Sequence, residues 1–192
     1  SIMKEGTTVE RKGTVFWITG LSGAGKTTVG GLLYQRLREQ NPPTVYLDGD
    51  ILRKVSGDDM GYSREDRLCN AMRIARLCHL LASQGLDVVC ATISMFSECW
   101  RWNRENIENY VEIYLRVPMQ ELIQRDQKGL YADAQRGTAQ HIVGFDMEFQ
   151  EPEGPDLIID NYGDLTPTTA VELIWEAFVI AGGVLRHDRM TR

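Results

Sequence analysis

The sequence has few of the residues that build metal sites or disulfide frameworks. Its 192 residues include three histidines and four cysteines, and no histidine stands at metal-ligand spacing from another histidine or a cysteine. The cysteines form no C-x-x-C pair and fall in segments that we predict to be helix or strand. We therefore expect no metal-binding cluster, and we predict the reduced, mostly buried thiols of a cytoplasmic protein at Cys69, Cys78, Cys90 and Cys99.

Long apolar runs and an excess of basic residues are missing as well. No run approaches the roughly 20 apolar residues that a membrane-spanning helix needs, and the first residues show no signal-peptide pattern. With 21 Lys and Arg against 27 Asp and Glu, the formal net charge is −6. Because phosphate polymers and anionic membranes require a basic face, we predict no nucleic-acid and no membrane partner. The net charge does not exclude small charged molecules as substrates.

The chain also lacks internal repeats, low-complexity segments and any sign of a second domain. Its length suits one domain with a sizeable core. We interpret residues 1–12 as a flexible, solvated N-terminal arm and residues 13–192 as a single domain.

One short stretch, by contrast, contains three of the 18 glycines within six residues. Residues 14–19 form an apolar run that predicts a buried strand, and a predicted helix begins near Lys26. The stretch between them matches the spacing G-x-x-x-x-G-K-[ST] of a phosphate-binding loop, in the position that this motif requires. We call it the phosphate loop, and its members are Gly20, Leu21, Ser22, Gly23, Ala24, Gly25, Lys26 and Thr27.

The residue types of the phosphate loop suit an anion. Glycines permit positive φ and let backbone N–H groups approach phosphate oxygens, and the N-terminus of the helix adds partial positive charge. Lys26 can reach terminal phosphates, and the hydroxyl of Thr27 can ligate Mg²⁺. The alternative is a glycine-rich turn without a ligand.

Two carboxylates follow the next predicted strand. Residues 44–47 are β-branched or aromatic in part, and Asp48-Gly49-Asp50 comes directly after them. In open α/β sheets, ligands bind outside the carboxyl ends of the strands, which is the edge that carries the phosphate loop. A carboxylate there can hold a magnesium-bound water or accept the proton of a substrate hydroxyl. The alternative is an Asp-Gly turn with Asp50 as a helix N-cap.

A long helix is predicted over residues 63–85, capped by Ser63 with Asp66 three residues later. Arg67 and Asn70 share one side of it, where a guanidinium suits an oxyanion, although charged residues on a helix are more often a solvated face. The run over residues 87–93 is the best candidate for a buried central strand, and Ser94 ends it.

The other predicted elements complete an α/β fold. The helix over 27–39 has Val29, Leu32, Leu33 and Leu37 on its inward face, and further strands are predicted over 110–117 and 156–160. Helices are predicted over 119–125 and 166–181, and another carries Trp100 and Trp102 as packing residues. The polar stretch over about 126–155 reads as a lid, with Lys128 brought onto phosphates. We expect a three-layer α/β/α fold with a mainly parallel five-stranded sheet.

Several motifs together resemble the adenylylsulfate kinase (APS kinase) family, over about residues 12–180. They are residues 20–28, 47–50 with Arg53, 61–67 with Asn70, Ile93-Ser94, and Lys128-Gly129-Leu130-Tyr131. The resemblance implies a P-loop kinase of sulfate assimilation, usually a homodimer. Such an enzyme transfers the γ-phosphate of ATP to the 3′-hydroxyl of adenosine 5′-phosphosulfate, with Mg²⁺, giving 3′-phosphoadenosine 5′-phosphosulfate (PAPS) and ADP.

The resemblance also assigns roles by position. It implies catalytic roles for Lys26, Asp48, Asp50 and Ser94, and magnesium ligation by Thr27 and Asp50. ATP would be held by the phosphate loop together with Thr28, Arg125 and Lys128. The acceptor nucleotide would be held by Arg53, Tyr62, Arg67, Asn70, Ile93, Ser94, Lys128 and Ile142, with Tyr62 stacked on its base. Ser94 matches a serine described in the family as a phosphoenzyme; direct in-line transfer needs no such step, and we expect it to bind substrate.

Two departures concern the acceptor. The family usually follows Ile-Ser with Pro, an aromatic residue and Arg, whereas this chain continues Met95-Phe96-Ser97. Ile142 stands near the place of a family Phe, which is absent here or displaced to Phe145. We predict an adenylylsulfate kinase; these changes are the features that would favour the alternative, a relative that phosphorylates cytidine diphosphoramidate in capsule biosynthesis. A GTP-dependent switch is disfavoured, because the chain contains no Asn-Lys-x-Asp sequence.

Overall fold

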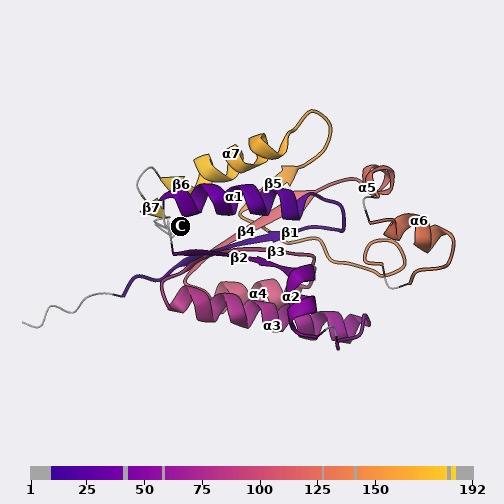
Figure 1. The fold of residues 1–192 in the computed structure, drawn as a ribbon, viewed down its shortest axis with the longest axis horizontal. Coiled ribbons are helices and arrows are strands. Elements are labelled where there is room, and N and C mark those ends of the chain that lie inside the picture. Colours follow the sequence, from indigo (N-terminus) through magenta and orange to yellow (C-terminus); the bar gives the residue numbers. More distant parts are fainter. Residues whose placement is uncertain are drawn as a thin grey trace, which may run out of the picture.

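The structure is a computed structural model that describes residues 10–40, 43–57, 59–126, 128–140, 142–180 and 183–184. Five parallel strands form one sheet in the order β2-β3-β1-β4-β5 (Figure 1). Their bounds are β1 Thr14–Thr19, β2 Thr44–Asp48, β3 Asp87–Thr92, β4 Asn109–Arg116 and β5 Leu157–Asp160. The predicted five-stranded sheet is therefore confirmed, and all of its pairings are parallel.

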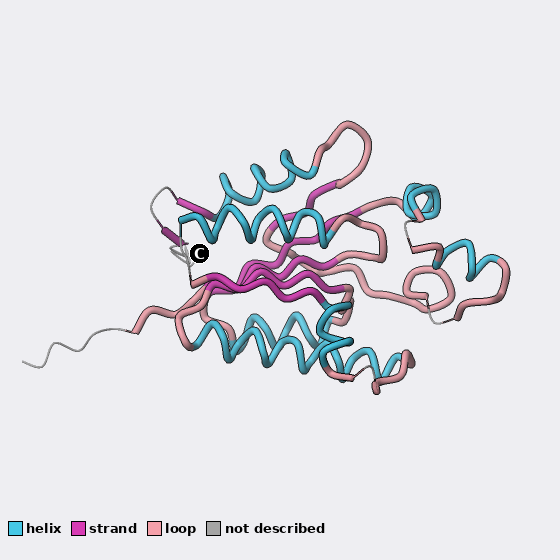
Figure 2. Tube along the Cα trace, viewed as in Figure 1, coloured by secondary structure: helices cyan, strands magenta, loops and turns pink. Residues whose placement is uncertain are grey.

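Helices cover both faces of the sheet, which gives the predicted three layers. The helices α1 (Lys26–Gln40) and α7 (Pro167–Phe178) lie on one face, and α3 (Arg64–Ser83) and α4 (Ser97–Asn106) lie on the other (Figure 2). Three short helices, α2 (Gly49–Val55), α5 (Met119–Arg125) and α6 (Leu130–Gln135), stand at the carboxyl ends of the strands. A small antiparallel ribbon, β6 (Val179–Ile180) with β7 (Gly183–Val184), follows α7.

The sheet interior forms the core, and its centre is β1. All six residues of β1 are buried, and β1 pairs with β3 on one side and with β4 on the other. The run over residues 87–93, predicted to be a fully buried central strand, forms β3, which is fully buried and has a strand on each side, but the middle place belongs to β1. Both strands are fully buried, so apolar composition could not rank them.

Some predicted details differ from the structure. Leu32 is 37% exposed, because the inward stripe of α1 runs through Val29, Leu33 and Leu37 with Gly30 beside it. The predicted lid is not only loop, since α6 lies within it. Helix α7 ends at Phe178 because the chain turns into β6 there; residue 181, the predicted end, lies outside the described residues.

Other predictions hold in the part of the chain that the structure describes. Ser63 caps α3 by accepting a hydrogen bond from the backbone N–H of Asp66 at 3.1 Å. Trp100 is buried, and all four cysteines are free, with Cys69 exposed and the other three buried. Among the described helices, none is long and apolar enough to cross a membrane. Residues 1–9 of the predicted arm lie outside the described residues, so the boundary at residue 12 stays a prediction.

Candidate active site

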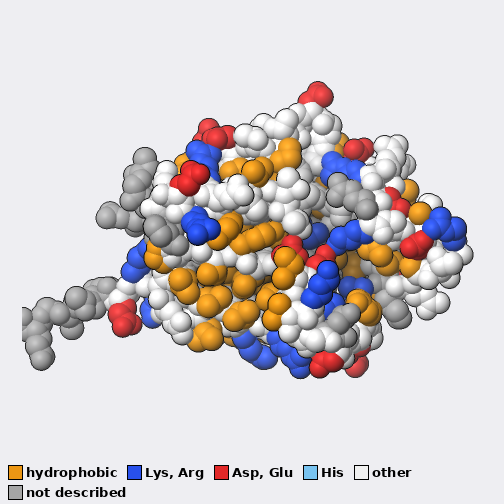
Figure 3. Space-filling model, in the orientation of Figure 1, with side chains coloured by type: hydrophobic (Ala, Val, Ile, Leu, Met, Phe, Trp, Pro, Cys, Tyr) orange, Lys and Arg blue, Asp and Glu red, His pale blue; other side chains and the backbone are white. Residues whose placement is uncertain are grey.

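The phosphate loop leaves the central strand at the edge where three other strands also end. In the register of the sheet, Thr19 of β1 stands beside Thr92 of β3 and Tyr114 of β4, and Asp48 of β2 stands beside Ala91. Basic and acidic side chains gather at this edge, at the junction between the sheet layers and the segment carrying α5 and α6 (Figure 3). The parallel topology thus brings the loop and the Asp48-Gly49-Asp50 segment together, as predicted.

The loop has the backbone that its glycines predict. Gly23 and Gly25 have φ of +85° and +93°, which a residue with a side chain rarely adopts. A Cβ on Gly25 would lie 2.6 Å from Nδ2 of Asn161, so the loop and this asparagine fit closely. The Asn161 amide donates to the carbonyl of Ala24 at 2.8 Å. Sequence reasoning missed Asn161, because its only signal is its place directly after β5.

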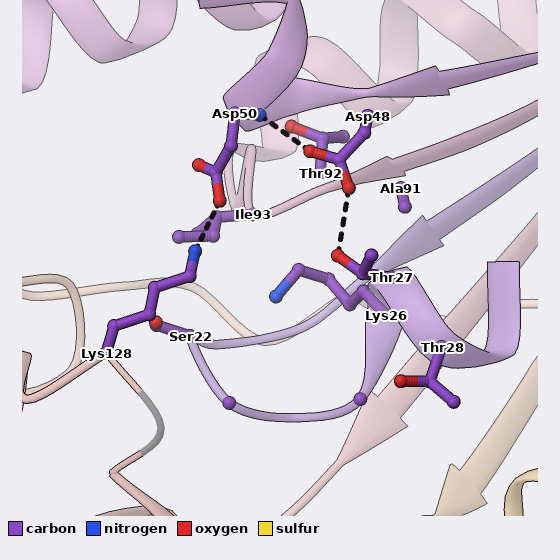
Figure 4. A pocket seen from close by; sticks show the side chains of 12 residues that line it. Ser22, Lys26, Thr27, Thr28, Asp48, Asp50, Ala91, Thr92, Ile93 and Lys128 are labelled. Carbon is purple, nitrogen blue, oxygen red and sulfur yellow. Dashed lines mark hydrogen bonds and ion pairs between the residues drawn. The ribbon is translucent and has the colours of Figure 1, made fainter. Parts of the chain in front are cut away.

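A cavity opens above the phosphate loop (Figure 4). It is lined by Ser22, Gly23, Gly25, Lys26, Thr27, Thr28, Asp48, Asp50, Ala91, Thr92, Ile93 and Lys128. Most of the predicted ATP-binding residues therefore line one cavity. Among those outside it, Arg125 donates to the carbonyls of Gly23 and Asn161, at 3.1 and 2.7 Å.

The two aspartates of this cavity do different things. Asp48 is 7% exposed, and its Oδ1 accepts hydrogen bonds from the backbone N–H groups of Asp50, at 2.9 Å, and Ile51. Its Oδ2 accepts from the Thr27 hydroxyl at 2.8 Å. The N-cap of α2 is therefore Asp48, and the alternative interpretation of Asp50 as the cap is wrong. The turn places the second carboxylate, that of Asp50, two residues past the cap, where it projects into the cavity.

Charge in the cavity is arranged around Asp50. Its carboxylate forms an ion pair with Lys128, although both side chains are more than half exposed. Partial burial acts to raise the pKa of Asp50, but the hydrogen bond and charge of Lys128, with Lys26 and Lys54, outweigh it and lower the pKa. Burial, followed by repulsion from Lys128, lowers the pKa of Lys26 to about 8. The Lys26 ammonium donates to the carbonyl of Leu21 at 2.7 Å.

A second cavity adjoins the first. We call it the acceptor cavity, and it is lined by Gly49, Asp50, Arg53, Arg64, Arg67, Asn70, Thr92, Ile93, Ser94, Met95, Phe96, Val143, Met147 and Glu148. Three of these residues, Asp50, Thr92 and Ile93, also line the first cavity. Asp50 is thus the carboxylate at which the two cavities meet.

The predicted acceptor residues separate into two groups. Arg53, Arg67, Asn70, Ile93 and Ser94 line the acceptor cavity, and Arg64 joins them without having been predicted. Arg64 falls within the motif over residues 61–67, but the resemblance assigns it no role, and a charged residue at a helix start is also typical of a solvated face.

Ser94 has an unusual backbone in this wall. Its φ of +30° is rare for a residue with a side chain and is of the kind that clusters at ligand sites. Its hydroxyl lies 2.6 Å from that of Thr92.

The two residues that the resemblance places against a base do not line this cavity. Tyr62 is 47% exposed and lies between two guanidinium groups, those of Arg53 at 4.3 Å and Arg67 at 5.4 Å from its ring centre. Ile142 is buried in the core, and Phe145 is 40% exposed and lines a separate hollow. From this segment, Val143, Met147 and Glu148 face the acceptor cavity instead.

Among the described residues, no group of three His, Cys, Asp or Glu side chains could hold a metal ion by itself. The cavity does bring together a hydroxyl, on Thr27, and a carboxylate, on Asp50. Oxygen donors of this kind, with phosphate oxygens and waters, suit the octahedral shell of Mg²⁺, which rarely uses an all-protein cage. The donor set therefore fits the predicted ion.

Comparison with known proteins gives a consistent result. Residues 12–160 match the adenylylsulphate kinase family. The chain is 44% identical over 160 residues to the cytidine diphosphoramidate kinase of Campylobacter jejuni, covering 83% of this chain and 93% of that protein. It is 42% identical over 162 residues to the adenylyl-sulfate kinase of Pseudomonas aeruginosa, covering 83% of this chain and 82% of that protein. Among solved structures, the APS kinase of Mycobacterium tuberculosis in complex with AMPPNP and APS has a TM-score of 0.79 and 33% identity, covering 87% of this chain and 98% of that one.

Proposed function

Because the chain belongs to the adenylylsulphate kinase family, we propose that it transfers the γ-phosphate of ATP to a ribose hydroxyl of a small nucleotide anion. One observation carries this proposal: Asp50 stands where the phosphate-loop cavity and the acceptor cavity meet. Phosphoryl transfer is chiefly a problem of positioning and charge stabilisation, so a site with two adjoining cavities and one shared carboxylate suits it.

On the donor side, the phosphate loop would bind the ATP phosphates through its inward backbone N–H groups and Lys26. Thr27 and Asp50 would hold Mg²⁺, which supplies charge neutralisation between the phosphates. Asp48 keeps the Thr27 hydroxyl and the start of α2 in place through its three hydrogen bonds. Arg125 supports the loop through the carbonyl of Gly23.

On the acceptor side, Asp50 would accept the proton of the attacking hydroxyl or order its approach. The carboxylate is paired with Lys128 in this structure, so Lys128 has to leave it. When ATP binds, its γ-phosphate would compete with Asp50 for the Lys128 ammonium. Movement of the Lys128 side chain from Asp50 to the phosphate would then leave the Asp50 carboxylate available as the base. Arg53, Arg64, Arg67 and Asn70 would hold the acceptor's anionic groups.

Between the two acceptors suggested by the sequence, we propose cytidine diphosphoramidate over adenosine 5′-phosphosulfate. The two positions that would stack on adenine, Tyr62 and Ile142, both lie outside the acceptor cavity, and Phe145 does not replace them. The 44% identical relative carries the cytidine diphosphoramidate name, whereas the 42% identical relative is an adenylyl-sulfate kinase. The altered segment Met95-Phe96 lines the same cavity, so it would contact the acceptor.

The decisive measurement is coupled ADP release by purified protein with ATP and Mg²⁺, offering each acceptor in turn. We expect kcat/KM for cytidine diphosphoramidate to exceed that for adenosine 5′-phosphosulfate by at least about tenfold, a difference of about 1.4 kcal/mol in transition-state binding. The Asp50→Asn variant, purified in parallel, controls for contaminating kinases. The reverse preference would overturn the choice of acceptor. If neither compound supported ADP release, the acceptor class would be overturned.

Two further expectations remain proposals: that the enzyme is a homodimer, and that it works in the cytoplasm. Light scattering after size-exclusion chromatography measures the first, and fractionation of the source cells measures the second.

A further inference from the structure

Side chains hold four consecutive carbonyls of the phosphate loop by hydrogen bonds. The donor to Leu21 is Lys26 of the loop itself, whereas the donors to the other three carbonyls lie outside the loop. The pairs are Leu21 with the Lys26 ammonium at 2.7 Å, Ser22 with the Tyr131 hydroxyl at 2.7 Å, Gly23 with the Arg125 guanidinium at 3.1 Å, and Ala24 with the Asn161 amide at 2.8 Å.

These bonds have a consequence for anion binding. A peptide unit whose carbonyl is fixed on one side presents its N–H group on the other, and a flip of that unit would break the bond. Three of the four donors come from residues more than 100 positions away in the chain. The inward set of N–H groups that binds phosphate is therefore maintained by the region after β4, not by the loop sequence alone.

Tyr131 differs from the other two distant donors because it belongs to α6, in the segment predicted to close over the site. It is 1% exposed, and burial, with the nearby Asp126 carboxylate, raises the pKa of its hydroxyl to about 12, so the hydroxyl stays protonated and donates. The Asp126 carboxylate accepts from the backbone N–H groups of Tyr131 and Ala132, at 3.0 and 2.9 Å. Asp126 adopts a φ of +25° in doing so.

The segment that carries Asp126 and Tyr131 also contacts the carboxylate of Asp50. Lys128 stands between Asp126 and Tyr131 and forms the ion pair with Asp50. Residues 128–131 therefore contact both the loop that would bind the donor phosphates and the carboxylate that would face the acceptor. From α6 the chain continues to Val143 and Met147, which line the acceptor cavity.

We propose that Tyr131 is a positioning residue that ties the lid helix α6 to the phosphate loop through the carbonyl of Ser22, so that ordering of the loop by ATP phosphates also orders the lid. Its hydroxyl touches no substrate and acts through the loop. The competing explanation is that the hydroxyl only satisfies a buried carbonyl and contributes to folding stability.

The test compares two variants that each remove one tyrosine hydroxyl from a buried hydrogen bond. Tyr131→Phe removes the bond to Ser22. Tyr110→Phe removes the bond that its hydroxyl donates to Glu112 at 2.7 Å and the bond that it accepts from the Asn103 amide of α4 at 3.3 Å. Titration calorimetry with a non-hydrolysable ATP analogue and Mg²⁺ measures donor affinity without any acceptor, and thermal denaturation without nucleotide measures stability.

We expect Tyr131→Phe to raise the Kd for the analogue about fivefold to tenfold, the range for one lost buried hydrogen bond. Tyr110→Phe should lose stability while its Kd stays within about twofold of the parent. An unchanged Kd in Tyr131→Phe would overturn the proposal, and so would an equal rise in both variants, which would mean that any loss of stability weakens binding.

A measurement on the unaltered protein covers the case in which Tyr131→Phe does not fold. In hydrogen exchange, the analogue should slow exchange of the amides of α6 together with those of the phosphate loop, because the two are linked. Protection of the loop with no change in α6 would overturn the proposal. The inference rests on the proposed binding of ATP by the phosphate loop, but neither readout requires an acceptor. An analogue that does not bind at all would overturn the proposed function, whereas binding without protection of α6 would overturn only this inference.

Discussion

Lys26 provides a prediction that can be worked out in numbers. Burial and repulsion from Lys128 lower its pKa to about 8 in the protein without nucleotide. The phosphates of ATP would surround the same ammonium with negative charge and raise its pKa again. Binding of ATP should therefore take up a proton, and the affinity should fall as the pH rises through about 8, because the free protein then has to regain the proton before it binds.

The magnitude follows from the fraction of free protein with a charged Lys26. With a pKa of about 8, roughly half of the molecules are charged at pH 8 and about a tenth at pH 9. If the charged form is the one that binds, the apparent Kd is the intrinsic Kd divided by this fraction. It should rise about fivefold between pH 8 and pH 9, with uptake of about 0.5 proton at the first pH and 0.9 at the second.

Titration calorimetry in buffers of different ionisation enthalpy measures the proton uptake directly. The Lys128→Met variant is the matched comparison, because losing the neighbouring positive charge should raise the pKa of Lys26 and reduce uptake at pH 8. A flat Kd and no proton uptake from pH 8 to pH 9 would refute the reasoning, since Lys26 would then stay charged without nucleotide.

Three shorter predictions concern other residues. Asp50→Asn should lower kcat about 10²-fold to 10⁴-fold, with the affinity for ATP kept within a few fold. Asp48→Asn should lower kcat and also the melting temperature, because α2 loses its N-cap. If Asp50→Asn turned over like the parent, Asp50 would have no part in the chemistry. Gly25→Ala should lose about 1–3 kcal/mol of unfolding free energy, since φ is +93° and the new Cβ meets Asn161, and a denaturant curve matching the parent's would contradict this strain. Iodoacetamide on the folded protein should modify Cys69 and spare the three buried cysteines, and mass spectrometry showing equal labelling of a second cysteine would contradict their burial.

The sequence alone was sufficient for what depends on local pattern. The apolar run before Gly20, the glycine spacing and the helix after Lys26 are contiguous, so they predict a strand, a loop and a helix without knowledge of distant contacts. The parallel sheet follows from alternating strands and helices, because parallel strands need crossover connections. That topology then places Asp48 and Asp50 at the edge of the phosphate loop.

Where two segments or two residues have the same sequence pattern, the sequence alone could not decide which of them takes a given place in the structure. Two buried strands, β1 and β3, have the same apolar character, and only strand pairing shows that β1 is the centre. Two aspartates two residues apart have equal chemistry, and only the direction of the chain into α2 decides that Asp48 is the cap and that Asp50 projects into the cavity, where it pairs with Lys128.

Tertiary structure alone decided which distant side chains meet. Tyr131 and Asn161 hold the carbonyls of Ser22 and Ala24 across more than 100 residues. Asn161 lies in no motif, and the motif over residues 128–131 did not indicate which residue Tyr131 contacts. Likewise, Arg64 lines the acceptor cavity while Tyr62 does not, although both precede or begin the same helix. The sequence thus determined the kind of reaction, because phosphate binding is encoded in a contiguous loop. Packing determined the shape of the acceptor cavity, because its walls come from segments whose distances are set only when the chain folds.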